Sequence, residues 1–433
     1  RTFQEYLAGC EMLHKRVPYR ELRQRAQEGD FWYLAAQLAA EELLYNQGFN
    51  ATKVLVDLAY PLCPSQPPTA EADEGEWRTL LWAGHCARVV GKRAIAQDTD
   101  DPEGGPHFLT RLCESLLDLM RRSPLTPVER ADAGRMLAVL GDPRLEVLDP
   151  LQIEWCEVPA GPFLMGSDQI ENAGPQHTVD LPYTYKISRY PITNAQYRHF
   201  VDAGGYANAA YWPEAIAHER WRDGQVRVYT FRDGSFIDEL RNANADYGEP
   251  LSLANHPVVG VSWYEALAFT RWLSDVMQES DLLPANWQIT LPSEAEWEKA
   301  ARGTDGRQYP WGDQLTTDHA NLRPSGIGHS SAVGAFASGV SPYGAEELMG
   351  NVWEWTRSLW GTDVGKPNFA YPYVAGDGRE DFMASDRTAR IIRGDSSYSD
   401  GASGCARRNG LNPYYWLDYL GFRIVASPST SGN

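Results

Sequence analysis

The sequence predicts an α+β protein in which an all-helical domain, residues 1–150, precedes a mixed domain, residues 151–433. Apolar residues recur at three- and four-residue spacing in segments 31–45, 77–90, 108–120 and 127–140, as they do in amphipathic helices. Near Asp149 the chain changes to short β-like runs with frequent Trp, Tyr, Gly and Pro. A length of 433 residues is enough for two to four domains.

In the N-terminal domain, segments 61–73 and 98–106 separate the predicted helices and are rich in Pro, Gly and acidic residues. We expect the helices to bury their apolar faces as antiparallel, solenoid-like pairs. In the C-terminal domain, amphipathic helices are predicted at 262–273 and 293–302. Ser293 can cap the second of these, and Glu294 and Glu296 then lie at its positive end. The long polar segment 207–250 is predicted to be a surface insertion.

The charge balance limits the classes of partner. The chain has 39 basic and 58 acidic residues, a formal charge of −19. This charge disfavours nucleic acid and anionic membranes as partners. There is no apolar run of 18 residues and no signal-peptide pattern at the start, so we expect a soluble, cytoplasmic protein. Residue 1 is Arg, which leaves the native start open, and the excess of Arg over Lys is compatible with a thermophile.

Common catalytic patterns are missing from the sequence. The six cysteines are far apart with no CxxC pair, which predicts free thiols rather than a zinc site or a disulfide framework. No GxxxxGK[ST], HExxH or GxSxG pattern occurs. The sequence therefore provides no support for a nucleotide site, a catalytic zinc or a nucleophilic serine.

A series of ordered phrases runs from Trp155 to Val425. The phrases are Val158-Pro-Ala-Gly-Pro-Phe-Leu-Met-Gly166, Tyr190-Pro-Ile-Thr-Asn-Ala-Gln-Tyr197, Pro257-Val-Val-Gly-Val-Ser-Trp263, Leu291-Pro-Ser-Glu-Ala-Glu-Trp-Glu298, Tyr309-Pro-Trp-Gly-Asp313, Gly350-Asn-Val-Trp-Glu-Trp355, Arg393-Gly-Asp-Ser396 and Gly421-Phe-Arg423. Together they resemble the formylglycine-generating enzyme, or sulfatase-modifying factor, family. This resemblance implies a C-type-lectin-like fold with little regular structure.

The Trp-Glu-Trp phrase carries two expectations. Strand geometry would send Trp353 and Trp355 to one side and Glu354 to the other, so we expect two buried indoles. The resemblance also implies a calcium ion at this phrase, held by the carboxylates of Glu347 and Glu354 and the backbone carbonyls of Gly350 and Val352. Such an oxygen ligand set suits Ca²⁺.

The resemblance does not extend to the family's known chemistry. The copper-binding cysteine pair of the oxidase is missing, because segment 397–404 contains no cysteine and Cys405 matches a later, non-catalytic one. Without a thiolate pair no copper site is expected. The related iron-dependent sulfoxide synthases need a histidine triad, and His14, His85 and His107 do not form one. We therefore expect a fold without enzymatic activity.

In the C-terminal segment, aromatic residues gather just before Gly421, in an order that does not alternate as in a half-buried strand. This segment, about residues 394–423, resembles the variable region of proteins diversified by retroelements, in which exposed residues vary on a fixed frame. Such residues should form one exposed surface for an unknown ligand, either a protein or another macromolecule, on a fixed frame of Gly394, Ser396, Arg408, Gly421, Phe422 and Arg423. The candidate ligand-binding residues are Ser397, Tyr398, Ser399, Asp400, Asn409, Leu411, Tyr414, Tyr415, Trp416, Leu417, Asp418 and Tyr419, with Asp395 as a further candidate where the family usually has Gly.

The start of the chain carries a second resemblance. The phrases Thr2-Phe-Gln-Glu-Tyr-Leu-Ala-Gly9 and Ala131-Asp-Ala-Gly-Arg-Met-Leu-Ala-Val-Leu-Gly-Asp-Pro-Arg144 resemble the helical end of NACHT modules in STAND-type signalling proteins, which implies an upstream NTPase. Three functions stay open. They are a diversified ligand-binding sensor, a copper or iron oxidase, and a structural module without a ligand.

Overall fold

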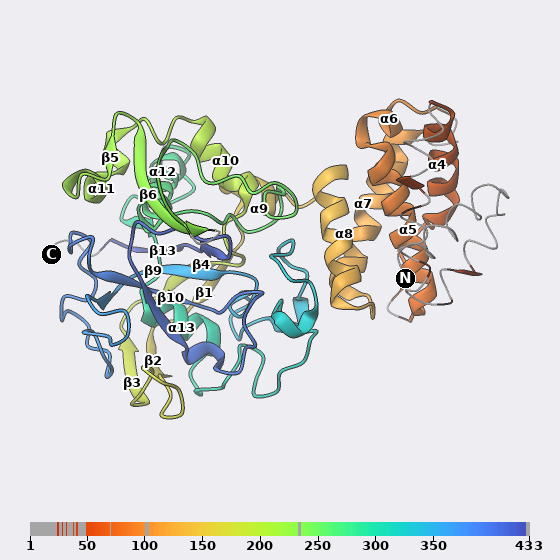
Figure 1. The fold of residues 1–433 in the computed structure, drawn as a ribbon. Helices are drawn as coiled ribbons and strands as arrows, with labels where there is room; N and C mark the ends of the chain where they lie inside the picture. The colour runs from red at the N-terminus through yellow and green to blue at the C-terminus, as the bar shows by residue number, and fades with distance from the viewer. Residues whose placement is uncertain are drawn as a thin grey trace. The chain divides into compact units, whose positions relative to one another are not determined.

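A computed structural model describes residues 49–69, 71–99, 104–232 and 235–429, together with the single residues 24, 25, 28, 32, 38, 40 and 41. The chain divides into two compact units, Arg1–Pro143 and Arg144–Asn433 (Figure 1). Figure 1 shows helices in the first unit and mixed helices and strands in the second. The predicted α+β class, with helices before a mixed domain, is confirmed.

The first unit is built from amphipathic helices joined by short loops. They are α4 (Phe49–Leu62), α5 (Glu74–Val90), α6 (Lys92–Ala96), α7 (Gly105–Arg122) and α8 (Pro127–Leu140). Thr126 and Glu129 form a reciprocal capping box at the start of α8. Helices α5, α7 and α8 confirm the helices predicted at 77–90, 108–120 and 127–140. Most of the helix predicted at 31–45, and the phrase at 2–9, lie outside the described residues.

The core of this unit also contains a buried ion pair. Leu80, Leu112 and Leu116 are fully buried between α5 and α7. Arg78 Nε donates to Glu129 Oε1 at 2.7 Å, which links α5 to the first turn of α8. Because both side chains are more than nine-tenths buried, this pair fixes how the two helices pack.

The second unit contains two four-stranded sheets. One has the order β1-β4-β13-β8 and the other β11-β10-β9-β12. The strands of the first are β1 (Trp155–Val158), β4 (Tyr185–Ser188), β8 (Trp287–Thr290) and β13 (Val425–Pro428). The strands of the second are β9 (Trp353–Gly361), β10 (Ala389–Arg393), β11 (Arg408–Leu411) and β12 (Leu420–Phe422). Strand β12 pairs with β9 in parallel, which brings the C-terminal segment onto the Trp-Glu-Trp phrase.

Shorter elements complete this unit. A hairpin joins β2 (Gly161–Met165) and β3 (His177–Leu181). Its other short elements are α9 (Leu145–Leu148), η1 (Pro150–Gln152), α10 (Asn194–Asp202), η3 (Arg323–Ser325), η4 (Ala337–Gly339) and η5 (Gly404–Ala406). Much of the remaining chain is loop, as predicted.

The two predicted helices are α12 (Trp263–Glu279) and α13 (Glu294–Arg302). Each starts with a capping box, Ser262 with Glu265 and Ser293 with Glu296. All nine residues of α13 are buried, including its three glutamates and its lysine. A helix with so many buried charges requires buried partners for them.

The predicted insertion at 207–250 has its own secondary structure. It contains η2 (Ala209–Tyr211), α11 (Pro213–Ala217) and a sheet of β5 (Trp221–Arg222), β6 (Gln225–Arg232) and β7 (Ser235–Arg241). Val226 and Val228 of β6 are fully buried, whereas Phe231 and Phe236 are 64% and 56% exposed. The insertion therefore packs on the domain through one face and presents aromatic side chains to solvent on another.

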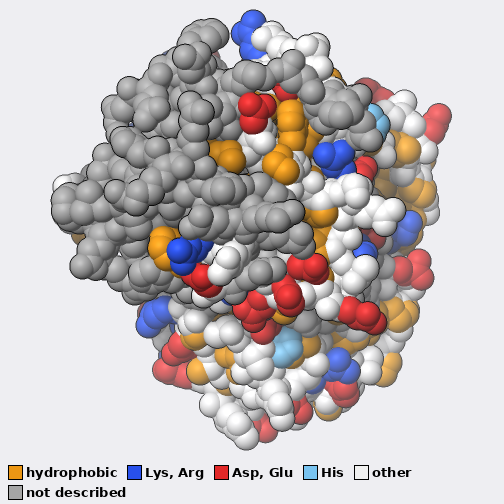
Figure 2. All heavy atoms as spheres, turned by 90° about the vertical axis from the view of Figure 1, so that its right-hand side faces the viewer, with side chains coloured by type: hydrophobic (Ala, Val, Ile, Leu, Met, Phe, Trp, Pro, Cys, Tyr) orange, Lys and Arg blue, Asp and Glu red, His pale blue; other side chains and the backbone are white. Residues whose placement is uncertain are grey.

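Within the described ranges, every helix is too short or too polar to cross a lipid bilayer. Figure 2 shows acidic side chains scattered over the described part of one face of the molecule. This distribution agrees with the net charge of −19.

Candidate functional site

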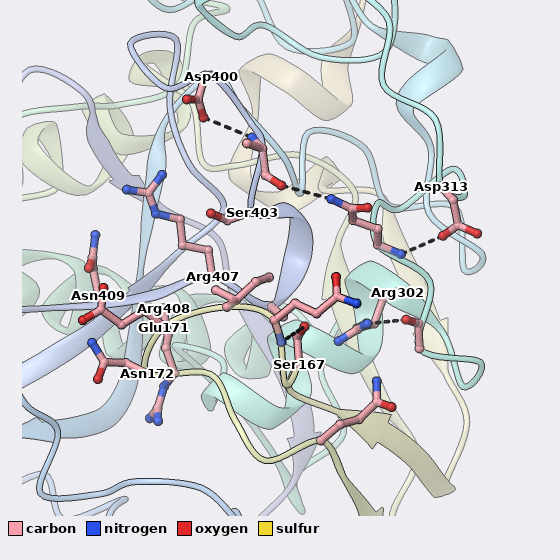
Figure 3. A pocket seen from close by; sticks show the side chains of 17 residues that line it. Ser167, Glu171, Asn172, Arg302, Asp313, Asp400, Ser403, Arg407, Arg408 and Asn409 are labelled. Carbon is pink, nitrogen blue, oxygen red and sulfur yellow. Dashed lines mark hydrogen bonds between the residues drawn. The ribbon is translucent and has the colours of Figure 1, made fainter.

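A polar cavity of about 700 Å³ lies in the second unit. Its wall comes from the loop between β2 and β3, from the end of α13 and the loop after it, and from residues around η5 (Figure 3). These segments contribute, among others, Glu171, Arg302 and Arg407. The volume is within the range of small-molecule sites, roughly 300–1,000 Å³. We call this space the polar cavity.

Two of the cavity arginines are fixed by glutamates of α13. Arg302 Nη1 donates to Glu298 Oε1 at 2.9 Å, and Arg408 Nη2 donates to Glu294 Oε1 at 2.8 Å. Glu294 and Glu298 are four residues apart and therefore share one face of the helix. Burial opposes ionisation of Glu298, but Arg393 and Arg302 hold its pKa below the usual value. Buried ion pairs with α13 therefore hold these two arginines in place at the cavity.

Arg407 differs from these two arginines. Its side chain is 35% exposed, and its Nη1 donates to Asp395 Oδ1 at 2.9 Å. The guanidinium lies 5.3 Å from the ring centroid of Trp353. Asp395 is buried, which raises its pKa to about 6 even though the neighbouring Arg407 lowers it. Arg407 is therefore the cavity arginine that is partly exposed to solvent and also held by an ion pair with a buried carboxylate.

The candidate ligand-binding residues fall into two groups. Asp400 and Asn409 are exposed and line the polar cavity. The second group lies near the aromatic C-terminal segment, where the rings of Tyr398 and Tyr419 are 5.5 Å apart in an edge-to-face arrangement. These two tyrosines are far apart in sequence but adjacent in space.

The segment around Tyr414 joins the inserted sheet. Tyr229 N donates to Tyr414 O at 2.9 Å, and Trp416 N donates to Tyr229 O at 3.1 Å. The ring of Phe236 lies 6.1 Å from that of Tyr415. The C-terminal segment thus extends the sheet beside β6, an arrangement that no pattern in the sequence signals.

Not every candidate is exposed. Leu411, Tyr414, Tyr415, Leu417, Asp418 and Tyr419 are half-buried, as is Ser399. Trp416 is only 4% exposed and Ser397 only 1%, so the expected exposure of these two residues is corrected. Trp416 is buried because its ring packs under Arg241 and beside Tyr247 of the insertion. Ser397 is drawn inward because its backbone N–H donates to Asn351 O at 3.1 Å. All six residues of the expected frame are buried, and their role as a fixed frame stays a prediction.

The residues predicted to bind calcium have separate partners. Glu354 accepts from Arg423 Nε at 2.7 Å and from Trp297 Nε1 at 2.6 Å. Glu347 accepts instead from the backbone N–H of Gly334 and from Asn351 Nδ2. Burial raises the pKa of Glu347 to about 8. Gly350 and Val352 lie in the turn between these two glutamates, and calcium binding at this turn stays a prediction.

The second unit matches a known protein family. The family model described as the sulfatase-modifying factor enzyme 1-like domain matches residues 152–428. This chain belongs to that family. Hercynine oxygenase of Mycobacterium tuberculosis is 32% identical over 280 residues, 61% of this chain and 58% of the relative. Hercynine oxygenase of Mycolicibacterium smegmatis is 31% identical over 374 residues, 79% of this chain and 76% of the relative.

Among solved structures, a variable protein of Treponema denticola has 18% sequence identity and a TM-score of 0.42. The match covers 63% of this chain and 95% of that protein. The match to the hercynine oxygenase of Mycobacterium tuberculosis covers less than two thirds of that protein's length.

The prediction that this family member has no enzymatic activity is wrong. It rested on the missing cysteine pair and histidine triad, yet relatives at 31–32% identity over much of the chain are named as oxygenases. The absence of these two motifs was a poor predictor of activity, because they represent only two known sets of metal ligands. The residues of the polar cavity that sequence reasoning missed include Glu171, Arg302 and Arg407, which lie on segments far apart in the chain.

The family resemblance implies iron or copper as the metal of related enzymes. The described residues of this sulfatase-modifying factor-like domain do not fit either metal. Burial raises the pKa of the Cys405 thiol to about 12, which disfavours a metal-binding thiolate. His177 and His218 contact the backbone of Tyr373 and Ala384 respectively. Within the described part of the chain, no three His, Cys, Asp or Glu side chains are grouped to hold a metal.

Proposed function

We propose that this chain is an enzyme that binds a small zwitterionic substrate in the polar cavity. The observation that carries this proposal is Arg407, a partly exposed guanidinium held at the cavity wall by one of its nitrogens. Its Nε and Nη2 can still donate two hydrogen bonds to a carboxylate. Such charge-assisted, two-point contacts provide both affinity and orientation.

Acidic groups in the same cavity complement this arginine. Glu171, Asp313 and Asp400 are exposed and line the polar cavity (Figure 3). Carboxylates attract a cationic group on the substrate, and more strongly in a recess than in open water. A molecule with both a carboxylate and a fixed positive charge therefore suits the cavity better than a simple anion.

Hercynine, the trimethylated betaine of histidine, is a molecule of this class. It carries a carboxylate, a quaternary ammonium and an imidazole, and relatives of this chain are named for it. We use it as the probe for the cavity. The oxygen chemistry that the relatives' name implies requires a cofactor, so the test below measures binding rather than turnover.

Calorimetric titration of the whole chain with hercynine tests the proposal. We expect binding, and we expect Arg407→Ala to weaken it about tenfold or more, since the substitution removes a charge-assisted contact. Arg222→Ala is the matched control, because Arg222 is an 88% exposed arginine outside the cavity. Absence of binding to the unaltered chain, or equal affinity for Arg407→Ala, would overturn the proposal.

A second candidate function is recognition of a macromolecule by the aromatic C-terminal surface. The contact between Tyr398 and Tyr419 favours it, because these residues bring two distant parts of the predicted variable region together. Rigid aromatic side chains supply contact area at low entropic cost. In this case the NACHT-like phrase at 2–9 would connect the surface to an upstream NTPase. Comparing the genomic sequence for 394–423 with nearby imperfect repeats tests this candidate.

A further inference from the structure

Asp395 is a buried carboxylate that does not itself line the polar cavity. It directly follows Gly394, which comes after the last residue of β10, and has a left-handed backbone with φ of 60°. Asp adopts this conformation more readily than most residues, but at a cost that other contacts must offset. Its side chain is 0% exposed. An acidic side chain in such a place needs a reason, because burial of a carboxylate is costly.

The geometry supplies that reason through Arg407. One carboxylate oxygen, Oδ1, accepts from Arg407 Nη1 at 2.9 Å, whereas Oδ2 is buried with no hydrogen-bond partner. On its other side Arg407 lies over the ring of Trp353. The guanidinium is thus held between a fixed charge and an aromatic face. Arg407 is also one of the residues that line the polar cavity.

We propose that Asp395 is a positioning residue that orients Arg407 for the carboxylate of the ligand. This inference rests on the proposed function of the cavity. Without the ion pair, the long arginine side chain would sample several rotamers and lose entropy on binding. The ion pair with Asp395 preorganises the Arg407 side chain, so a ligand carboxylate can bind the guanidinium without first restricting its rotamers.

The same contact makes ligand affinity depend on pH. The charged and titratable groups around Asp395 are Arg407, Asp400, Tyr309 and Cys405, and the Ser399 hydroxyl also contacts it. Arg407 stabilises the ionised form, whereas burial and Asp400 oppose it. The carboxylate is ionised above about pH 6 and protonated below it, so the ion pair with Arg407 is lost on acidification. Affinity for a carboxylate ligand should therefore fall as the pH drops through 6.

The test compares Asp395→Asn and Asp395→Gly with the unaltered chain. Asn keeps the shape of the side chain, and Gly removes both the carboxylate and the backbone strain, so the two variants guard against a folding defect. Asp305→Asn is the matched control. Asp305 also pairs with an arginine, Arg307, at 2.7 Å, and neither residue lines the cavity.

Two readouts separate this inference from the proposed function. The first needs no ligand: phenylglyoxal modification of Arg407 at pH 8, followed by mass spectrometry with Arg222 as internal reference. We expect Arg407 to react about tenfold faster in both Asp395 variants than in the unaltered chain or in Asp305→Asn. Equal modification rates in all four proteins would overturn the positioning role.

The second readout is the dissociation constant for hercynine between pH 5 and pH 8. We expect the unaltered chain to bind about tenfold more weakly at pH 5 than at pH 8, and the Asp395 variants to bind weakly at both. Unchanged affinity of the variants would overturn the inference while leaving the cavity proposal intact. If the unaltered chain fails to bind hercynine, the proposed function fails, and the modification rates still decide whether Asp395 positions Arg407.

Discussion

Arg423 and Glu354 form a two-point ion pair at the centre of the second unit. Arg423 Nε donates to Glu354 Oε2 at 2.7 Å, and Arg423 Nη2 donates to Oε1 at 2.9 Å. Both side chains are fully buried. The pair joins the Trp-Glu-Trp phrase of β9 to the residue that follows β12, so two phrases distant in sequence are locked together.

Glu354→Gln should destabilise the domain strongly. The substitution leaves Arg423 charged and buried without its counter-ion, which costs about 3–5 kcal/mol. Urea unfolding followed by tryptophan fluorescence measures the change in free energy. Glu154→Gln is the control, because Glu154 is half-exposed and its ion pair with Arg189 contributes at most about 1 kcal/mol. Similar losses in both variants would contradict the central role of the pair.

The stability of the Glu347→Gln variant, relative to that of the unaltered chain, should increase as the pH rises. Glu347 has a pKa near 8 in the folded chain and 4.5 as its ordinary value, so the folded state binds the proton more tightly. The unaltered chain therefore loses stability between pH 4.5 and 8, by an amount on the order of a few kcal/mol. The melting temperature at pH 6 and pH 9 measures this. Glu157→Gln, on an exposed position of β1, should show no such difference.

Calcium should act through Glu347 if it binds at the predicted turn. Glu354 is bound by Arg423 and Trp297, which leaves the Glu347 carboxylate as the acidic group able to exchange its hydrogen bonds for an ion. We expect Ca²⁺ to raise the melting temperature at pH 9 in the unaltered chain and not in Glu347→Gln. Mg²⁺ at equal concentration is the control. A Ca²⁺ effect that survives in Glu347→Gln places the ion elsewhere.

Trp416→Ala should cost far more stability than a substitution at a surface position of the C-terminal segment. Trp416 is buried against Arg241 and Tyr247, so truncation should cost about 3–5 kcal/mol. Tyr415→Ala, at the preceding, half-buried position, should change stability within about 1 kcal/mol. Chemical denaturation of the two variants provides the comparison. Equal costs would mean that this segment has no division into fixed and tolerant positions.

Cys405 should resist alkylation in the folded chain. Burial raises the pKa of its thiol to about 12, and the side chain is 1% exposed, so both thiolate fraction and access are low. Iodoacetamide at pH 8 followed by peptide mass spectrometry should leave Cys405 unmodified until denaturant is added. Rapid labelling in the native state would show that this thiol is available for chemistry after all.

The sequence by itself determined the helices α5, α7, α8, α12 and α13, because their apolar spacing and capping residues act within a few turns. The ordered phrases also indicated the family, because their order and spacing can be read from the sequence without knowing which residues are in contact. The two indoles of Trp353 and Trp355 are buried, as strand geometry predicted, although Glu354 between them is buried as well.

Only the tertiary structure decided the polar cavity and the partners of its charges. Arg302, Arg407 and Arg408 meet loop 166–176 across long sequence separations, and no local pattern reports such pairings. The same holds for Trp416, whose aromatic neighbours suggested a surface but whose ring is covered by the insertion. Burial depends on what packs against a residue, and at these positions the packing partner comes from a distant part of the chain.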